Sequence, residues 1–412
     1  MHAAKRPTLR PLILGLVGLA LLFLLWREQR RSAAPDATDS TSGAQPSGGS
    51  AAGPRGLPGA PLAGAGTGGA GQLGAGGGSG ASDESAAQRA ERLRMAEERL
   101  STYRKFAQYP PGSRPAREHP DQLFPTAPVV RGTPLSLGGR PSEHIVLKLR
   151  QDRLVVVGSE SIELGLRCED SQAQALPCSV EKAEISALPL SAPAAGAASP
   201  RKPAGPRPVE FVEDSRSEHR GELIATLRPA DLGLVDTTWP LRVDVTIKAG
   251  RDPMEQGAAL FDFLFTPEPP AVSTGAVREA VVAGSLMLSY PLTVRRAGRY
   301  LLHVRVDDAN GKPLAYLESN SLLQAGPQQV PFTVFGKLIL DEKPAFPLKV
   351  RDFDGYLLKE DVDPDREQIP TRAGYHHTTQ VYSLSAFSAA EWQSEEKTRH
   401  EREFEKDVEQ AR

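Results

Sequence analysis

Residues 241–248 read Leu-Arg-Val-Asp-Val-Thr-Ile-Lys, an unbroken alternation of apolar and polar side chains. Because successive side chains of an extended chain point to opposite faces, this period of two is typical of a strand with one buried face. The same pattern precedes and follows it, at Ile145, Leu147 and Leu149 and at Phe261, Phe263 and Phe265. We therefore expect a β domain over residues 143–270.

A second β domain is expected over residues 271–388. Apolar alternation at 302–306 leads into a turn whose Asn310-Gly311 pair is a strong hairpin signal, and Val330, Phe332 and Val334 alternate again. Short strands separated by turn residues, with few helical segments, favour an immunoglobulin-like β-sandwich in each domain. The fold class is therefore mostly β. Pro267 to Pro270 is interpreted as the hinge between the domains.

Other stretches cannot form a core. The chain of 412 residues contains 38 glycines and 36 prolines, and residues 32–81 consist almost entirely of Gly, Ala, Ser and Pro. Such a segment buries too little apolar surface to offset the entropy of ordering, so we expect a disordered tether. Its fifty residues would span about 40 Å. A similar stretch at about 188–208 is expected to be a disordered insertion in the first domain.

The N-terminal residues 1–31 are expected to be a cytoplasmic tail and a transmembrane signal anchor. Residues 11–26 form an uncharged apolar run between basic flanks. A bilayer-spanning helix needs about 17–25 residues, so the run is short, but flanking arginines can extend it by snorkelling. A cleaved signal peptide, cut near Ser32-Ala33-Ala34, is the alternative. The anchor would place the rest of the chain in the periplasm or outside the cell.

Cys168 and Cys178 are the only cysteines in the sequence. No second pair is present for a zinc site, and Cys168 continues the inward-facing series of Ile162, Leu164 and Leu166. We favour a disulfide that staples a hairpin in an oxidising compartment. Two ordinary buried thiols are the alternative.

Helices are expected before the first β domain and after the second. Residues 82–108 repeat alanine or leucine every seven positions, at Ala86, Leu93, Leu100 and Ala107, which predicts a helix that either forms a coiled coil or docks on the following domain. A Pro-rich lead-in follows at 109–142. Residues 389–412 are expected to be a charged helical tail.

The sequence gives no sign of catalysis. It has no nucleotide loop, nucleophile elbow or zinc-protease helix, so we expect neither an enzyme nor a cofactor. A net charge of −2 without a basic stripe gives no reason to expect a nucleic-acid partner. Asp361, Asp363 and Asp365 could hold calcium, although the EF-hand glycine and final glutamate are missing, and a solvated acidic loop is the favoured interpretation.

Three other groups of polar residues have simple structural interpretations. Asp307, Asp308 and Asn310 are expected to build a turn through hydrogen bonds to the backbone. His376 and His377 are adjacent, so on a strand they point to opposite faces and do not readily share a metal. Tyr109 and Arg114 are candidates for contact with a partner, although packing of Tyr109 against the first sandwich is favoured.

Two segments resemble bacterial envelope proteins of the choice-of-anchor type. One comprises Tyr109-Pro110-Pro111-Gly112-Ser113-Arg114-Pro115 and Asp121-Gln122-Leu123; the other comprises Phe335-Gly336-Lys337-Leu338-Ile339, Val350-Arg351-Asp352 and His377-Thr378-Thr379-Gln380-Val381-Tyr382. The resemblance covers about residues 105–390. It implies tandem immunoglobulin-like domains carried by interchangeable anchors, and no catalysis. The insertion at 188–208 departs from a compact module of this kind.

Two functions are therefore considered. The first is a membrane-anchored extracytoplasmic structural or interaction protein, whose sandwiches contact an envelope protein or a glycan. The second is a regulatory or assembly subunit of an envelope complex, recruited through its terminal helices. The first rests on the lack of catalytic motifs together with analogy of fold.

Overall fold

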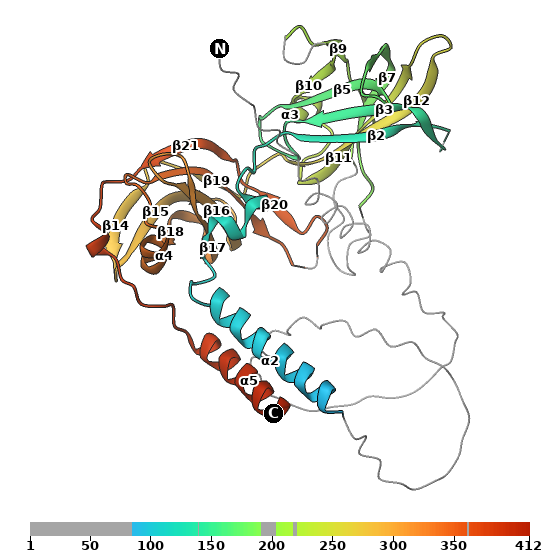
Figure 1. Ribbon diagram of the computed structural model, residues 1–412. Coiled ribbons are helices and arrows are strands. Elements are labelled where there is room, and N and C mark those ends of the chain that lie inside the picture. Colours follow the sequence, from blue (N-terminus) through green and yellow to red (C-terminus); the bar gives the residue numbers. More distant parts are fainter. Residues whose placement is uncertain (1–84, 139, 191–202, 217–220, 361) are drawn as a thin grey trace, which may run out of the picture. The chain divides into compact units, whose positions relative to one another are not determined.

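The computed structural model describes residues 85–138, 140–190, 203–216, 221–360 and 362–412. Their fold is mostly β, as predicted, with a helix at each end of the described chain (Figure 1). The predicted membrane segment at 11–26 and the tether at 32–81 lie outside the described residues. Among the helices that are described, none has the length and apolar character needed to cross a membrane.

The first sandwich consists of strands β2 to β12. Its strand order is β8-β7-β11-β12-β2-β3-β5-β10-β9, with β4 beside β12 and β6 beside β5. β12 and β2 pair through Ala258 and Ser136, so two layers meet at this point and enclose one core. The elements are β2 (Val129–Leu137), β3 (Arg140–Gln151), β4 (Val155–Val157), β5 (Ile162–Asp170), β6 (Ala175–Leu176), β7 (Cys178–Ala187), β8 (Arg207–Pro208), β9 (Val212–Glu213), β10 (Leu223–Leu227), α3 (Pro229–Leu232), β11 (Trp239–Ala249) and β12 (Glu255–Thr266).

The alternation at 241–248 has the predicted consequence. Leu241, Val243, Val245 and Ile247 of β11 are buried, and Arg242 on the other face forms an ion pair with Asp262 of β12. The sandwich begins at Val129 rather than at 143, because β2 pairs along β3. Of the predicted insertion at 188–208, residues 191–202 lie outside the described residues. At its two ends the N–H of Leu188 donates to the carbonyl of Pro240, and β8 pairs with β7.

The second sandwich receives strands from both sides of the first in the sequence. One sheet has the order β1-β17-β16-β19-β20 with β21 beside β19, and the other has the order β13-β15-β14 with β18 beside β15. Because β1 precedes β2 in the chain, the first sandwich is inserted between two strands of the second. The elements are β1 (Ser113–Pro115), β13 (Ala271–Ser273), β14 (Arg278–Val282), β15 (Ser285–Val294), β16 (Gly298–Asp307), β17 (Pro313–Leu323), β18 (Gly326–Val334), α4 (Gly336–Glu342), β19 (Lys349–Leu358), β20 (Arg366–Gln368) and β21 (Arg372–Thr378).

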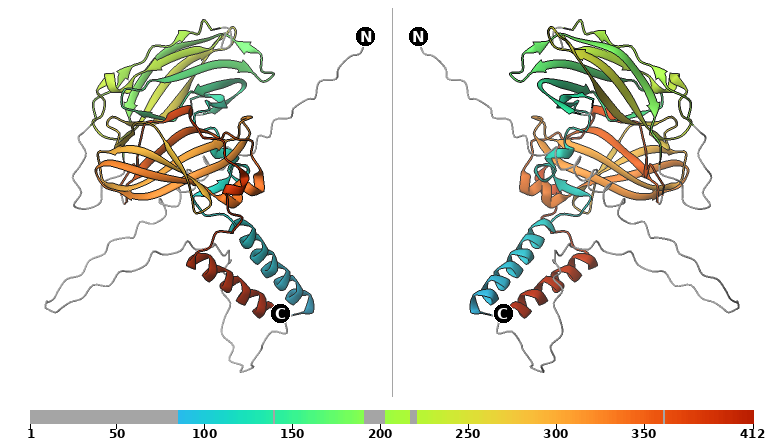
Figure 2. Two further views of the ribbon diagram at one scale, coloured as in Figure 1. Left: turned by 90° about the vertical axis from the view of Figure 1, so that its left-hand side faces the viewer. Right: turned by 90° about the vertical axis from the view of Figure 1, so that its right-hand side faces the viewer.

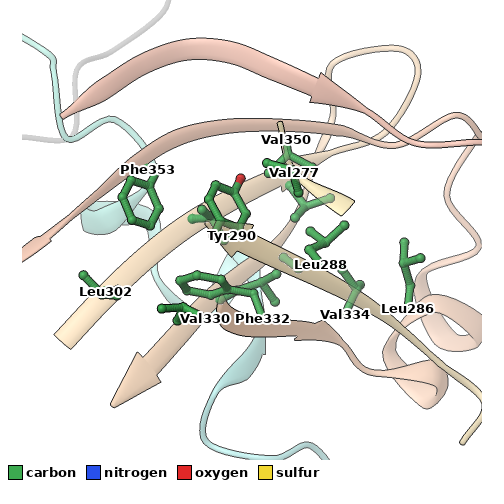
Figure 3. Close-up of a cluster of buried hydrophobic side chains, with 14 of the residues drawn as sticks. Val277, Leu286, Leu288, Tyr290, Leu302, Val330, Phe332, Val334, Val350 and Phe353 are labelled. Atoms are coloured by element: carbon green, nitrogen blue, oxygen red, sulfur yellow. The ribbon is translucent and has the colours of Figure 1, made fainter. Parts of the chain in front are cut away.

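Aromatic rings lie among aliphatic side chains in the core between these two sheets (Figure 3). Tyr290 of β15 stacks on Phe353 of β19 at 5.0 Å between ring centroids, and meets Phe332 of β18 edge-on at 5.2 Å. Such offset and edge contacts stabilise a core beyond simple burial of area.

The predicted hairpin joins β16 to β17, with Gly311 at a φ of 82° and Asp308 accepting from the backbone N–H groups of Asn310 and Lys312.

The terminal helices α2 (Ala86–Phe106) and α5 (Glu395–Ala411) pack antiparallel and lie side by side in all three views (Figures 1 and 2). Ala96 faces Val408 and Ala411 in a small apolar seam, and Tyr103 contacts Phe404 at 5.2 Å between centroids. α2 therefore pairs within the chain with α5, a partner that its own sequence pattern does not identify. The α5 helix begins at Glu395, where Ser394 caps its N-terminus by accepting from the N–H of Lys397.

Candidate functional site

A segment that we call the strap, residues 109–124, lies across the second sandwich. Its short strand β1 pairs with β17, and Ser113 accepts a hydrogen bond from the N–H of Phe335. Tyr109 at its start is 4 % exposed, and its hydroxyl donates to Asp341 at 2.8 Å. Burial, and then the Asp341 carboxylate, raise the pKa of Tyr109 to about 12, so this hydroxyl stays a donor in the physiological range. The strap is thus an integral part of the second sandwich.

Two arginines on the outer face of the β16 and β19 sheet hold the other end of the strap. Arg305 Nε donates to the carbonyl of Gln122 at 2.7 Å, and Arg351 Nη1 donates to the carbonyl of Leu123 at 2.6 Å. Arg305 is 1 % exposed and Arg351 is 6 % exposed. Guanidinium groups buried to this extent must be paired and hydrogen-bonded, because an isolated buried charge is strongly unfavourable.

Carboxylates on the same sheet neutralise these arginines. Arg351 bonds to Asp307 at 2.7 Å and to Asp352 at 2.6 Å, while Arg305 bonds to Asp354 and to the carbonyl of Asp352. Asp352 sits in the left-handed region at a φ of 52°, where Asp is tolerated better than most residues. A bulge in the pairing of β19 with β21 at this point turns both Arg351 and Asp352 toward the cluster. We call the group Arg305, Asp307, Arg351, Asp352 and Asp354 the arginine cluster.

His303 extends the arginine cluster along β16. Its Nδ1 lies 3.0 Å from Asp354 Oδ1, and its Nε2 lies 3.7 Å from Glu318 Oε2 of β17. Burial opposes the charged imidazolium, but hydrogen bonds with the two carboxylates outweigh it, so the pKa of His303 is raised. The same contact lowers the pKa of Glu318.

The linker that leaves the first sandwich is held in a similar way. The predicted hinge, Pro267 to Pro270, offers carbonyls but few N–H groups. Arg296 donates to the carbonyl of Glu268 at 2.7 Å, and Tyr300 donates to the carbonyl of Pro270 at 3.0 Å. Both connections of the inserted sandwich are therefore bound to the second one by side-chain donors.

The arrangement is suited to holding a chain segment in place. Its cations already face carboxylates or carbonyls, and each donor that reaches the strap has an acceptor there. Among the described residues, no group of three or more His, Cys, Asp or Glu side chains is placed to hold a metal ion.

The structure locates the residues that the sequence singled out. Cys168 and Cys178 form the predicted disulfide, which joins β5 to β7. Of the calcium candidates, Asp361 lies outside the described residues, Asp363 is exposed, and Asp365 forms an ion pair with Arg366. Because Asp361 lies outside the described residues, the favoured interpretation of these residues as a solvated acidic loop stays a prediction.

Other predicted residues have internal partners. Arg114 donates to the carbonyl of Phe106 at the end of α2, and Tyr109 packs in the core of the second sandwich rather than on the first. His376 and His377 diverge as expected: His376 Nε2 lies 2.6 Å from the Tyr290 hydroxyl, and His377 Nε2 lies 2.6 Å from Glu279.

The arginine cluster was missed by sequence reasoning. Arg305 and Arg351 occupy polar positions of alternating strands, which a period of two assigns to solvent. Asp307 was expected in the turn beside Asp308, yet it lies under Arg351 at 2 % exposure. The available signal was the concentration of opposite charges at neighbouring outward positions, at Arg305, Asp307, Arg351 and Asp354.

Comparison with known proteins gives no family. No family model matches the chain, and no curated protein matches it. Among solved structures, it is similar to a DUF4785 family protein from Legionella pneumophila, with 14% identity, a TM-score of 0.38, and coverage of 60% of this chain and 59% of that one. The FN1–FN3 domains of chicken CNTN1 share 10% identity at a TM-score of 0.20, with coverage of 62% and 99%. Latent PorU from Porphyromonas gingivalis shares 8% identity at a TM-score of 0.17, with coverage of 61% and 34%. The chain thus spans less than two thirds of the Legionella protein and of PorU.

Proposed function

We propose that this chain is a membrane-anchored extracytoplasmic protein that presents two β-sandwiches as structural or interaction modules to an envelope protein or a glycan. The observation that carries the location is the Cys168–Cys178 disulfide. Disulfides persist in oxidising compartments and are rare in the cytosol. The apolar run at 11–26 supplies the anchor of the proposal, in keeping with the resemblance to choice-of-anchor proteins.

The presentation role is supported by how the modules are connected. The first sandwich is inserted between β1 and β13, and both of its connections are bound by arginine or tyrosine donors of the second sandwich. Side chains committed to holding connections suit a scaffold whose loops and faces meet partners.

Location and anchoring are tested together on the full chain in cells. In one measurement, cells are broken and the membrane and cytosolic fractions are separated. In the other, intact cells are treated with a thiol reagent that does not cross the inner membrane, either before or after reduction. We expect the chain in the membrane fraction, with Cys168 and Cys178 labelled in intact cells only after reduction. Recovery of the chain from the cytosol with both thiols free would contradict the proposal.

The second candidate, recruitment through the terminal helices, is favoured by the α2–α5 pair, because it offers a continuous helical surface. Crosslinking of the native envelope followed by mass spectrometry would separate the two functions. Crosslinks from the sandwiches support the first function, whereas crosslinks confined to residues 86–106 and 395–411 support the second.

A further inference from the structure

A continuous chain of contacts connects His303 with the strap. His303 Nδ1 bonds to Asp354 Oδ1, and the other oxygen of Asp354 bonds to Arg305. Arg305 then donates from Nε to the carbonyl of Gln122 in the strap. Two contacts thus separate His303, where the charge changes, from Arg305, the group that holds the strap.

A second route passes through an aromatic ring. Tyr316 of β17 stacks on His303 at 5.6 Å between centroids, with an interplanar angle of 19°. On its other side it meets His119 of the strap at 5.1 Å, and the Arg305 guanidinium lies 5.3 Å from its centroid. The same ring therefore contacts the histidine, the arginine and the strap.

We propose that docking of the strap is linked to protonation of His303, so that the imidazolium holds the strap down and the neutral imidazole loosens it. The charged and titratable groups that face His303 come from every neighbouring element. They are Arg305 on its own strand, Glu318 and Tyr316 on β17, Asp354 and Tyr356 on β19, and His119 of the strap, which lies on Tyr316.

The charge balance explains the direction. With His303 protonated, Asp354 faces two cations, His303 and Arg305, and Glu318 faces His303. When His303 loses its proton, Arg305 alone remains for Asp354, and the imidazole nitrogen facing Glu318 no longer donates, so Glu318 loses its paired cation. Carboxylates that lose a buried partner gain from contact with water. Displacement of the Gln122 carbonyl from Arg305, which is 1 % exposed, would open the Arg305–Asp354 pair to water.

The sign of the pH dependence follows from linkage. The pKa of His303 is raised in the folded state, so its contribution is fully present below the ordinary histidine pKa of about 6.5. That contribution is lost as the pH rises through the raised value. The strap should therefore be held more tightly in mild acid than in mild alkali. Because the strap joins α2 to the first sandwich, its release would free one of the two connections of that sandwich.

Hydrogen exchange of the purified full-length chain in detergent tests the proposal. Exchange of peptides covering 109–124 is measured at about pH 5.5 and about pH 8, and each rate is corrected for its intrinsic pH dependence. We expect protection of the strap to be at least about threefold higher at the lower pH, while peptides from β15 serve as an internal reference for global unfolding. Equal corrected protection at the two pH values would overturn the proposal.

Three variants test whether His303 is the source of the pH dependence of strap protection. His303→Gln should leave strap protection nearly independent of pH, while His144→Gln, at an exposed position of the first sandwich, should retain the wild-type dependence. His119→Gln should also retain it, and loss of the dependence in that variant alone would transfer the effect to the strap's own histidine and overturn the proposal. If His303→Gln does not fold, Glu318→Gln removes one carboxylate partner and should shift the protection midpoint to lower pH. An unchanged midpoint would count against His303.

Discussion

Arg351 Nε lies 2.7 Å from Asp307 Oδ2 on neighbouring strands, and the two side chains form an ion pair with almost no access to solvent. The same guanidinium donates to Asp352 and to the carbonyl of Leu123, so one residue joins two carboxylates and the strap. Burying two charges is unfavourable by itself, and hydrogen bonds from Arg351 and from the hydroxyl of Tyr375 to Asp307 Oδ2 offset part of that cost, while the buried Asp307 Oδ1 has no partner among the described residues. We therefore expect replacement of Arg351 to be the most destabilising single substitution in the arginine cluster.

Arg351→Met should lower the stability of the second sandwich by about 3–5 kcal/mol, because it leaves Asp307 buried without its cation. Hydrogen exchange of β15 and β16 along a urea series measures the change. Arg299→Met, on the exposed part of β16, is the matched control and should alter stability by no more than about 0.5 kcal/mol. Adding Asp307→Leu to Arg351→Met should recover part of the loss. No recovery would show that the ion pair is not the main consequence of losing Arg351.

The disulfide should stabilise the first sandwich selectively. Cys168 and Cys178 close a short loop. The double variant Cys168→Val, Cys178→Ser should therefore lower the free energy of unfolding of the first sandwich by about 2–4 kcal/mol. Hydrogen exchange of β5 and β11 in urea would register the loss, and β15 would stay unchanged. The wild type should lose a similar amount on reduction, whereas the double variant should not respond to the reductant. If the double variant also lost stability on reduction, the reductant would be acting on something other than this disulfide.

His376 should make the second sandwich sensitive to acid. Burial lowers the pKa of His376, and its Nε2 lies against the hydroxyl of Tyr290. The unfolded chain therefore takes up the proton first, so the contribution of His376 is present above the ordinary pKa of about 6.5 and is lost as the pH falls through the lowered value. His376→Gln should raise the stability in urea at about pH 5 relative to that at about pH 7.5, compared with the wild type. A variant with the wild-type difference would exclude His376 as its source.

The sequence predicted the strands well because one-sided burial leaves a local signal. Alternation at 241–248 and at 302–306 depends only on neighbouring residues, and it marked the inward faces correctly. The same rule failed for Arg305 and Arg351, because a period of two reports which face is buried and not what covers the other face. The partners of these arginines, Gln122 and Leu123, lie 183 and 228 positions away.

The topology was not available from local patterns for a related reason. The strand β1 has three residues, with two prolines just before it and another at its end, which by composition suggested a connecting segment. It becomes a strand because β17 provides a register, pairing Arg114 with Tyr316. The cysteines, in contrast, were informative, since their number left one intramolecular pairing and Cys168 continued an inward-facing series.

The α2–α5 pair should behave as one cooperative unit. α5 carries few large apolar residues, and α2 alone has a thin apolar seam, so neither helix should be stable in isolation. Val408→Asp places a carboxylate at a position that is 6 % exposed, beside Ala96. We expect amides of α2 to lose at least about tenfold in hydrogen-exchange protection, corresponding to about 1.4 kcal/mol. Gln410→Asp adds the same charge at an exposed position of α5 and should leave α2 nearly unchanged. If α2 kept its protection in Val408→Asp, its stability would have to come from contacts other than the seam with α5.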